Sequence, residues 1–368
     1  MNDRNSMTAS GSMQPAPTLS NAIPFVEYDL DNGMHVILSR SQRVPLVVTN
    51  LWYRVGSKDD PPSRTGFAHL FEHMMFQGSK HIGKAAHFSF IQRAGGSLNA
   101  TTNVDRTNYF ETLPMTELEL ALWLESDRML ALDVTKENFE NQRAVVKEER
   151  RQRYENRPYG RVWETIIPHL FPTSGYHWTT IGSMQHLDEA TIDDARAFHA
   201  EFYKPNNCSL LLAGQFEEAN ARALIERYFG NIPRGTDIAR RDQTIAPVGG
   251  AIRLTMHDAV KLPAVHLTFQ ACKAFEREEY ILDLLSDVLG TGRSSRLYQE
   301  LVYRRAIAKD AHAFNDSNEK AGEFSLSATV QLGHSPEEVE DALWSELQKI
   351  QEHGIDEREL EKVKNRAE

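Results

Sequence analysis

The chain has 368 residues, 40% of them hydrophobic and 25% charged, which is typical of a globular protein with roughly two domains. Its 52 acidic residues outnumber the 41 basic ones, and the formal charge of −11 argues against a nucleic-acid binder because no basic stripe offsets it. No apolar stretch has the length of a transmembrane helix. From the charge and from this observation, respectively, we expect neither nucleic acid nor a membrane as a partner.

The N-terminal residues 1–22 are polar and rich in Ser, Met and Pro. They lack the apolar core of a signal peptide, so we predict a flexible tail and a cytoplasmic protein, or a periplasmic one if a signal peptide has been removed. Cys208 and Cys272 stand far apart in apolar runs. We interpret them as buried thiols, since neither has the close partner of a zinc or redox cysteine.

The predicted folded part begins with two short strands within Val26–Ser39, which flank the strong turn signal Asp31-Asn-Gly. A third, largely apolar strand is predicted over Pro45–Val55. A helix is predicted over Thr65–Gln77, because its apolar residues recur with helical spacing. These apolar residues are Phe67, Leu70, Phe71, Met74 and Met75.

A helix over His81–Arg93 precedes a predicted hairpin of two strands, Ser97–Thr102 and Thr107–Leu113. Two longer helices follow, each opened by a threonine suited to cap it, Thr116–Leu130 and Thr135–Arg153. The remaining elements of this unit are a strand over Ser209–Ala213 and a helix over Ala219–Phe229.

Residues 235–250 contain Gly and Pro but few large apolar residues, and we interpret them as a linker between domains 23–234 and 251–368. The second domain repeats the order of strands followed by helices. Its predicted elements are strands Ile252–Met256, Ala264–Ala271 and Phe324–Val330, and helices Tyr280–Leu289, Ser295–Tyr303, one from Ser335 and Asp356–Arg366. We therefore predict an α+β fold of two related units, each with a mostly antiparallel sheet packed by helices. The second unit is shorter, and we expect it to be incomplete.

The sequence His69-Leu-Phe-Glu72-His73 is the strongest candidate for a metal site. Residues four apart lie on one face of a helix, so both imidazoles can reach a single metal ion. Glu72 projects beside them and can take a proton from water, while the apolar residues face the core. A tetrahedral catalytic zinc site needs one more protein ligand and leaves the fourth position to water.

The third ligand is expected from another element, and the helix that begins at Thr135 offers two acidic candidates. Glu149 shares one helix face with Gln142, Val145 and Val146, which places its charge on the buried side. Glu148 is the competitor, and a surface salt bridge is the alternative for both because basic residues surround them. Spacing favours Glu149.

These residues resemble the His-x-x-Glu-His signature of the insulinase/pitrilysin metallopeptidases, including the mitochondrial processing peptidases. The resemblance extends from Ile23 to the end of the chain. Its further motifs are Met74-Met-Phe-Gln-Gly-Ser, Gly95-Gly-Ser-Leu-Asn-Ala, Asn141-Gln-Arg-Ala-Val-Val-Lys-Glu-Glu-Arg, Tyr203-Lys-Pro-Asn-Asn, Tyr228-Phe-Gly-Asn-Ile-Pro and Gly290-Thr-Gly-Arg-Ser-Ser-Arg-Leu.

The resemblance implies a zinc endopeptidase that hydrolyses peptides or unfolded polypeptides and forms one half of a clamshell. One zinc ion would be held by His69, His73 and Glu149, and the family's spacing selects Glu149 over Glu148. Asn99 and Ala100 resemble residues that pair with the substrate backbone, along an edge strand to which an extended peptide can add.

Two departures from the family pattern have consequences. Gln142 stands where the family often has a glutamate, and we expect it to orient His69 or His73 without adding charge. Val302 and Lys309 occupy the places of an Arg and a Tyr that the far half of the clamshell supplies. This predicts that a partner, either a related zinc-free subunit or a second copy, brings that pair.

The rival interpretation is a non-catalytic scaffold or assembly subunit of the same family. The complete set of metal-binding residues with Glu72 argues against it, since a scaffold needs no carboxylate to activate water.

Overall fold

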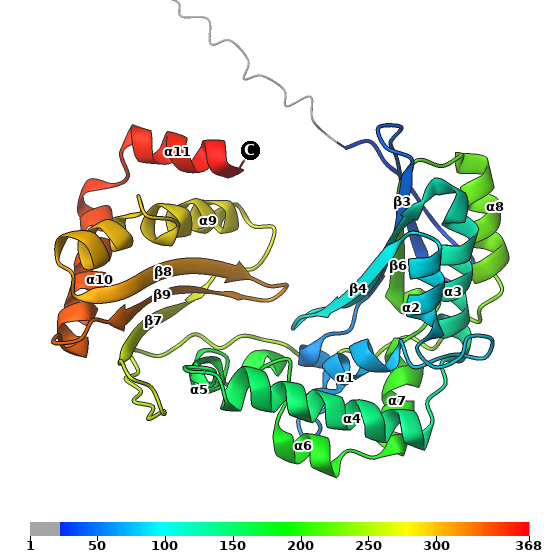
Figure 1. Cartoon of the computed structure of the whole chain (residues 1–368), viewed down its shortest axis with the longest axis horizontal. Coiled ribbons are helices and arrows are strands. Elements are labelled where there is room, and N and C mark those ends of the chain that lie inside the picture. The colour runs from blue at the N-terminus through cyan, green and yellow to red at the C-terminus, as the bar shows by residue number, and fades with distance from the viewer. Residues whose placement is uncertain (1–22, 368) are drawn as a thin grey trace, which may run out of the picture.

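The computed structural model describes residues 23–367, which form two β-sheets with their own helices in successive parts of the chain (Figure 1). The predicted tail, residues 1–22, lies outside the described residues. The prediction of an α+β fold with mostly antiparallel sheets is confirmed, with one parallel pair in the first sheet. No helix of residues 23–367 combines the length and apolar character needed to cross a membrane.

The first sheet has six strands, and β4 lies at one edge, where within residues 23–367 it is hydrogen-bonded only to β5. In spatial order the strands are β1 (Val26–Asp29), β2 (His35–Arg40), β6 (Cys208–Gly214), β3 (Leu46–Tyr53), β5 (Thr107–Pro114) and β4 (Ser97–Thr102). Buried and more exposed residues alternate along β2 and β3, because successive side chains of a strand point to opposite faces. One face of the sheet therefore contributes to a core.

Eight helices belong to this part of the described chain. They are α1 (Phe67–Met74), α2 (Ala86–Arg93), α3 (Leu118–Ala131), α4 (Lys136–Arg150), α5 (Val162–Leu170), α6 (Met184–Glu189), α7 (Ile192–Phe202) and α8 (Glu218–Phe229). Helices α2, α3 and α8 stand beside the sheet, whereas α1, α4, α6 and α7 gather at its base (Figure 1). Helix α1 contacts α4, β4 and β5, so it lies between the edge of the sheet and the long helix.

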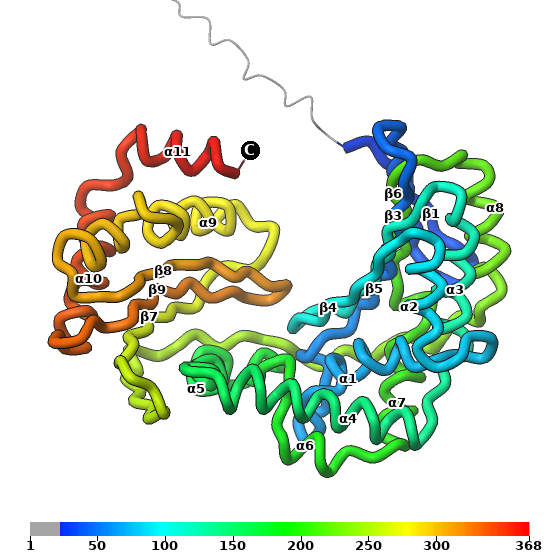
Figure 2. The backbone as a smooth tube through the Cα atoms, viewed as in Figure 1, coloured from blue at the N-terminus to red at the C-terminus, as the bar shows by residue number. Residues whose placement is uncertain are grey.

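The second sheet has three antiparallel strands with β9 in the middle. Its strands are β7 (Ala264–Ala271), β9 (Gly322–Val330) and β8 (Ala308–Ser317), and its helices are α9 (Arg277–Gly290), α10 (Pro336–His353) and α11 (Glu357–Ala367). A π-helical segment, Tyr298–Arg304, precedes β8. A separate apolar core joins the sheet to α9 and α10, and α11 contacts α9. The backbone trace shows the two sheets as distinct bodies (Figure 2).

The predicted strand Ile252–Met256 is wrong, since residues 251–258 contain neither strand nor helix. Its alternate residues Ile252, Leu254 and Met256 are exposed. The segment has the alternation of a strand, but none of the strands in residues 23–367 pairs with it, and strand geometry needs a hydrogen-bonded neighbour. Strand β8 and helices α5 to α7 were not predicted; α6 and α7 do begin with capping residues, Ser183 and Thr191.

The two sheets are tied together by a cluster of ion pairs next to the β8–β9 turn. Lys58 Nζ donates to Asp105 Oδ1 at 2.7 Å and also binds the carboxylate of Glu319. The backbone N–H of Glu319 donates to Asp105 Oδ2 at 2.7 Å. Lys58 is almost fully buried, so this cluster fixes the turn of the second sheet against the first unit.

Candidate functional site

The N-terminus of α1 is capped by a side chain from outside the helix. Asp60 is buried, and its carboxylate accepts hydrogen bonds from the N–H groups of Gly66, at 2.7 Å, and Ala68, at 2.8 Å. A carboxylate at this end satisfies backbone donors that have no partner within the helix and interacts favourably with the helix dipole. Asp60 therefore sets the start of the helix that carries His69, Glu72 and His73.

A loop around Gly182 holds α1 and α4 in a fixed relation. Gly182 has a φ of +71°, and a Cβ there would lie 2.3 Å from the Thr65 carbonyl oxygen, so the loop passes directly against the start of α1. From the other side, Arg150 Nη1 donates to the Gly182 carbonyl at 2.8 Å. Because Arg150 follows Glu149, this contact also fixes the end of α4.

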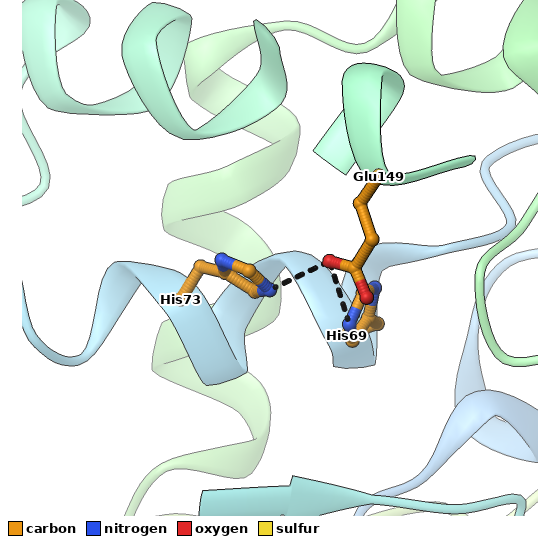
Figure 3. Close-up of side chains that lie close together, drawn as sticks. All are labelled: His69, His73 and Glu149. Atoms are coloured by element: carbon orange, nitrogen blue, oxygen red, sulfur yellow. Dashed lines mark ion pairs between the residues drawn. The ribbon is translucent and has the colours of Figure 1, made fainter. Parts of the chain in front are cut away.

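The structure brings together the three residues predicted to bind metal. The Nε2 atoms of His69 and His73 lie 3.7 Å and 3.4 Å from Oε2 of Glu149 (Figure 3). One donor atom from each of the three side chains lies within 4.8 Å of the other two. The two rings come from adjacent turns of α1, and Glu149 reaches them from the last turn of α4, as Figure 3 shows.

The electrostatics of the cluster suit a cation. Burial, together with the neighbouring His73 ring, lowers the pKa of His69 to about 4, so this imidazole is neutral near pH 7. The hydrogen-bonding His73 ring lowers the pKa of Glu149, which keeps the carboxylate charged. Two imidazole nitrogens and one carboxylate oxygen are a donor set of catalytic zinc sites. The residues present therefore fit a zinc ion.

Glu72 lies on the same helix and is held by a bond from the edge strand. Thr102 Oγ1, at the end of β4, donates to Glu72 Oε2 at 2.6 Å. Burial raises the pKa of Glu72, and the Thr102 hydroxyl opposes that shift. The carboxylate thus faces the place where β4 passes α1, rather than the apolar core.

Glu148 and Glu149 point in different directions. The side chain of Glu148 is 54% exposed and accepts hydrogen bonds from Arg151, at 3.2 Å, and Gln152, at 3.0 Å. Glu149 is 17% exposed and also pairs with Arg153 at 2.8 Å. A surface salt bridge was the alternative role for both residues. Glu148 has that role, whereas Glu149 forms a salt bridge and also lies beside the two imidazole rings.

Gln142 is buried on α4, as its spacing predicts, but it makes a different hydrogen bond from the one expected. Its Nε2 donates to Asn141 Oδ1 at 2.8 Å. Within residues 23–367 it has no hydrogen bond to His69 or His73, and Nδ1 of His69 is buried without a partner. The Gln142 amide, which we expected to orient an imidazole ring, is therefore bonded to the neighbouring Asn141 instead.

Asn99 and Ala100 lie on β4, the edge strand that runs past α1. Asn99 is exposed and Ala100 is buried. The Ala100 N–H donates to Asn99 Oδ1 at 2.9 Å. These residues therefore lie on the strand whose last residue, Thr102, contacts Glu72, which agrees with the edge position expected for them.

Sequence reasoning missed three residues that shape this site. Arg153, four residues after Glu149 on one helical face, had a recognisable signal in its spacing. Thr102 and Asp60 had none, because each acts across a distance in the chain that only folding closes. Their partners, Glu72 and Ala68, belong to α1.

Two family models match the chain. The model described as Insulinase (Peptidase family M16) matches residues 35–172, and that described as Peptidase M16 inactive domain matches residues 189–367. The four residues His69, Glu72, His73 and Glu149 all fall in the first match.

Similar proteins cover most of the chain. The zinc protease PqqE of Helicobacter pylori is 29% identical over 346 residues, 91% of this chain and 76% of that protein. The mitochondrial-processing peptidase subunit beta of Blastocladiella emersonii is 24% identical, over 87% of this chain and 70% of that protein. The crystal structure of a protease from Helicobacter pylori matches with a TM-score of 0.89 at 27% identity, over 94% of this chain and 84% of that one. The chain belongs to the insulinase family of peptidases, family M16.

Proposed function

We propose that this protein is a zinc-dependent endopeptidase that hydrolyses peptides or unfolded polypeptides, with one zinc ion held by His69, His73 and Glu149. The convergence of their three donor atoms, with Glu72 on the same helix, carries the proposal. Family membership supports a peptidase, since relatives are named zinc proteases.

In this proposal the side chains divide the chemistry between them. A zinc ion bound here would lower the pKa of its bound water towards about 7 and polarise the peptide carbonyl. Glu72 takes the proton from the attacking water and later delivers it to the departing amine. Thr102 holds the Glu72 carboxylate in place, and its hydroxyl can keep that bond in both protonation states because a carboxyl group retains an acceptor oxygen.

The open edge of β4 offers a place for an extended substrate. Only one side of this strand is paired in residues 23–367, so its other backbone groups can bond an added strand. A peptide bound there passes Thr102 and therefore Glu72. It must also replace the bond from the Ala100 N–H to Asn99, which now satisfies one donor of the strand.

A partner chain is part of the proposal. Val302 packs partly buried against the second core, and Lys309 is exposed on β8. Neither lines the cavity of ≈ 880 Å³ that lies next to Thr102 and Arg153. We infer that a related zinc-free subunit, or a second copy, supplies the Arg and Tyr that these positions lack.

The direct test is zinc content together with hydrolysis of a quenched fluorescent peptide. We expect about one zinc per chain and cleavage that a chelator abolishes and added zinc restores, with the partner present if the isolated chain is inactive. A chain that holds zinc yet cleaves no peptide with any related subunit would favour the scaffold interpretation.

Removing the third donor separates the two neighbouring glutamates. Glu149→Gln is expected to weaken zinc binding at least about 100-fold, because a ligand contributes more than the supporting residues whose loss costs 10- to 100-fold. Glu148→Gln is the matched control and should bind zinc as the unmodified chain does, since its side chain is exposed. Competition with a chromophoric chelator measures both affinities, and equal affinities would contradict the assignment of Glu149.

A further inference from the structure

One face of the second sheet is polar and turned towards the cavity of ≈ 880 Å³. Along β9 the apolar residues Phe324, Leu326, Ala328 and Val330 belong to the second core, so the alternate residues point the other way. Glu323, Ser327 and Thr329 line the cavity, with Asp310, His312 and Asp316 from β8. An acidic group thus stands at each end of this polar face.

Two carboxylates stand opposite each other at one end of that face. Asp316 and Glu323 are directly paired in the β8–β9 register, an arrangement of like charges that destabilises a sheet. Glu323 is only 8% exposed, whereas Asp316 is exposed. Within residues 23–367 no Lys, Arg or His nitrogen lies within 4.0 Å of either carboxylate, and Glu323 accepts no hydrogen bond.

Both acids have a raised pKa. Burial, together with the charge of Asp316, raises the pKa of Glu323 to about 7. Partial desolvation of its carboxyl group likewise raises the pKa of Asp316, opposed by a hydrogen bond from the Asn318 side chain, with Asp105 as a further negative neighbour. Asp105 itself is paired with Lys58, so its charge is already compensated. A positively charged group placed between Asp316 and Glu323 would offset the electrostatic repulsion between the two carboxylates.

The walls around the pair are aromatic. Trp163 and Phe314 pack edge to face at 5.4 Å between ring centroids, and Phe171 and Tyr176 do so at 5.6 Å. All four line the same cavity. Aromatic faces attract cations and also bury the aliphatic stem of a long side chain.

The cavity begins at the candidate site. Thr102, which donates to Glu72, and Arg153, which pairs with Glu149, both line it. The β4–β5 turn residues Asn103 and Val104 continue the lining beyond Thr102. A peptide added to β4 would therefore run past Glu72 and place its next side chains in this cavity.

We propose that Asp316 and Glu323 form a subsite for a basic side chain of the peptide substrate, lysine or arginine, at a position beyond the cleaved bond. The proposal rests on the proposed peptidase function and adds its substrate preference. The ammonium or guanidinium group would lie between the two carboxylates, and its methylene stem would pack on the aromatic walls.

The cavity also contains two arginines, and they favour a different ligand. Arg153 is already paired with Glu149, whereas Arg157 is exposed and forms no ion pair within residues 23–367. A preference for acidic peptides would follow if Arg157 governed the cavity. Glu323 should prevail, because its side chain is largely buried and a charge acts more strongly in a desolvated pocket than at an exposed position such as that of Arg157.

Binding, rather than turnover, tests the subsite. The zinc-loaded Glu72→Gln chain is titrated into fluorescent peptides in which one lysine is moved along an otherwise neutral sequence. Each peptide has a counterpart with norleucine, which keeps the stem and removes the charge, and one with glutamate. We expect lysine at one position to bind about tenfold more tightly than norleucine, the order of a charge-assisted contact.

The double substitution Asp316→Asn with Glu323→Gln, in the same Glu72→Gln background, is expected to reduce this preference to within about twofold. These changes remove like-charge repulsion, so the fold should be kept, and thermal melting checks it. Asp310→Asn, which removes a carboxylate from the same strand and face, is the matched control and should retain the preference.

Equal affinities for the lysine and norleucine peptides, including no measurable binding of either, overturn the subsite. So do a preference for glutamate and a lysine preference that survives the double substitution. Cleavage of the norleucine peptide by the unmodified chain, with the partner present if the isolated chain is inactive, tests the peptidase function separately, because neither carboxylate contacts His69, His73 or Glu149 in residues 23–367.

Discussion

Glu72→Gln is expected to reduce peptide hydrolysis by about 10³-fold while zinc remains bound, within the range that general acid–base groups contribute. The amide has nearly the size of the carboxylate and keeps an oxygen that can accept the Thr102 hydroxyl bond. It cannot take a proton from water near neutral pH. Only the proton transfer is therefore removed.

Two measurements on the same preparation check this prediction, the zinc content and the rate of cleavage. Glu72 contributes no atom to the group of three convergent donors, so the zinc content should match that of the unmodified chain. Thr102→Val is a useful companion, since it removes the bond that holds the carboxylate but leaves the carboxylate itself, and should cost less activity. Near-normal cleavage by Glu72→Gln would refute its role as the base.

Arg128→Met is expected to destabilise the first unit by about 3–5 kcal/mol, the cost of leaving a buried charge without its partner. Arg128 is fully buried, and its Nε donates to Glu125 Oε2 at 2.9 Å. Its guanidinium also lies over the rings of Tyr109, at 4.5 Å, and Phe76, at 5.1 Å. Glu111 lies in the same buried cluster, so the substitution leaves two carboxylates without a cation.

The pH dependence of this variant follows from the same cluster. Burial raises the pKa of Glu111 and of Glu125 to about 7, and Arg128 opposes both shifts. Without Arg128 the folded state binds protons more readily than the unfolded state, so stability must rise as the pH falls from 7 towards about 4.5. Urea unfolding at two pH values measures the effect.

A second substitution provides the control for Arg128. Replacing both members of a buried ion pair with apolar residues is often nearly neutral, so Arg128→Met with Glu125→Leu should be more stable than Arg128→Met alone. A single variant within about 1 kcal/mol of the unmodified chain at pH 7 would mean that the carboxylates are already neutral there.

Two features of the site follow from residue spacing along the chain. His69 and His73 share a helical face because they are four residues apart, whatever the helix packs against. Position on the helix also favoured Glu149 over Glu148. The structure agrees for Gln142 and Val146, which are buried, but Val145, assigned to the same face, is 43% exposed. Local periodicity is enough for such features because backbone geometry fixes them.

Contacts between residues far apart in the chain depend instead on how the elements pack. The approach of Glu149 to the two rings depends on how α1 packs against α4 and on the loop at Gly182. The failure of Ile252–Met256 as a strand has the same origin, because strand pairing depends on a neighbour that the segment's own alternation cannot specify. The opposition of Asp316 and Glu323 likewise follows from the register of β8 and β9. Contacts of this kind join residues that are far apart in the chain, and their energies become available only when the whole unit folds.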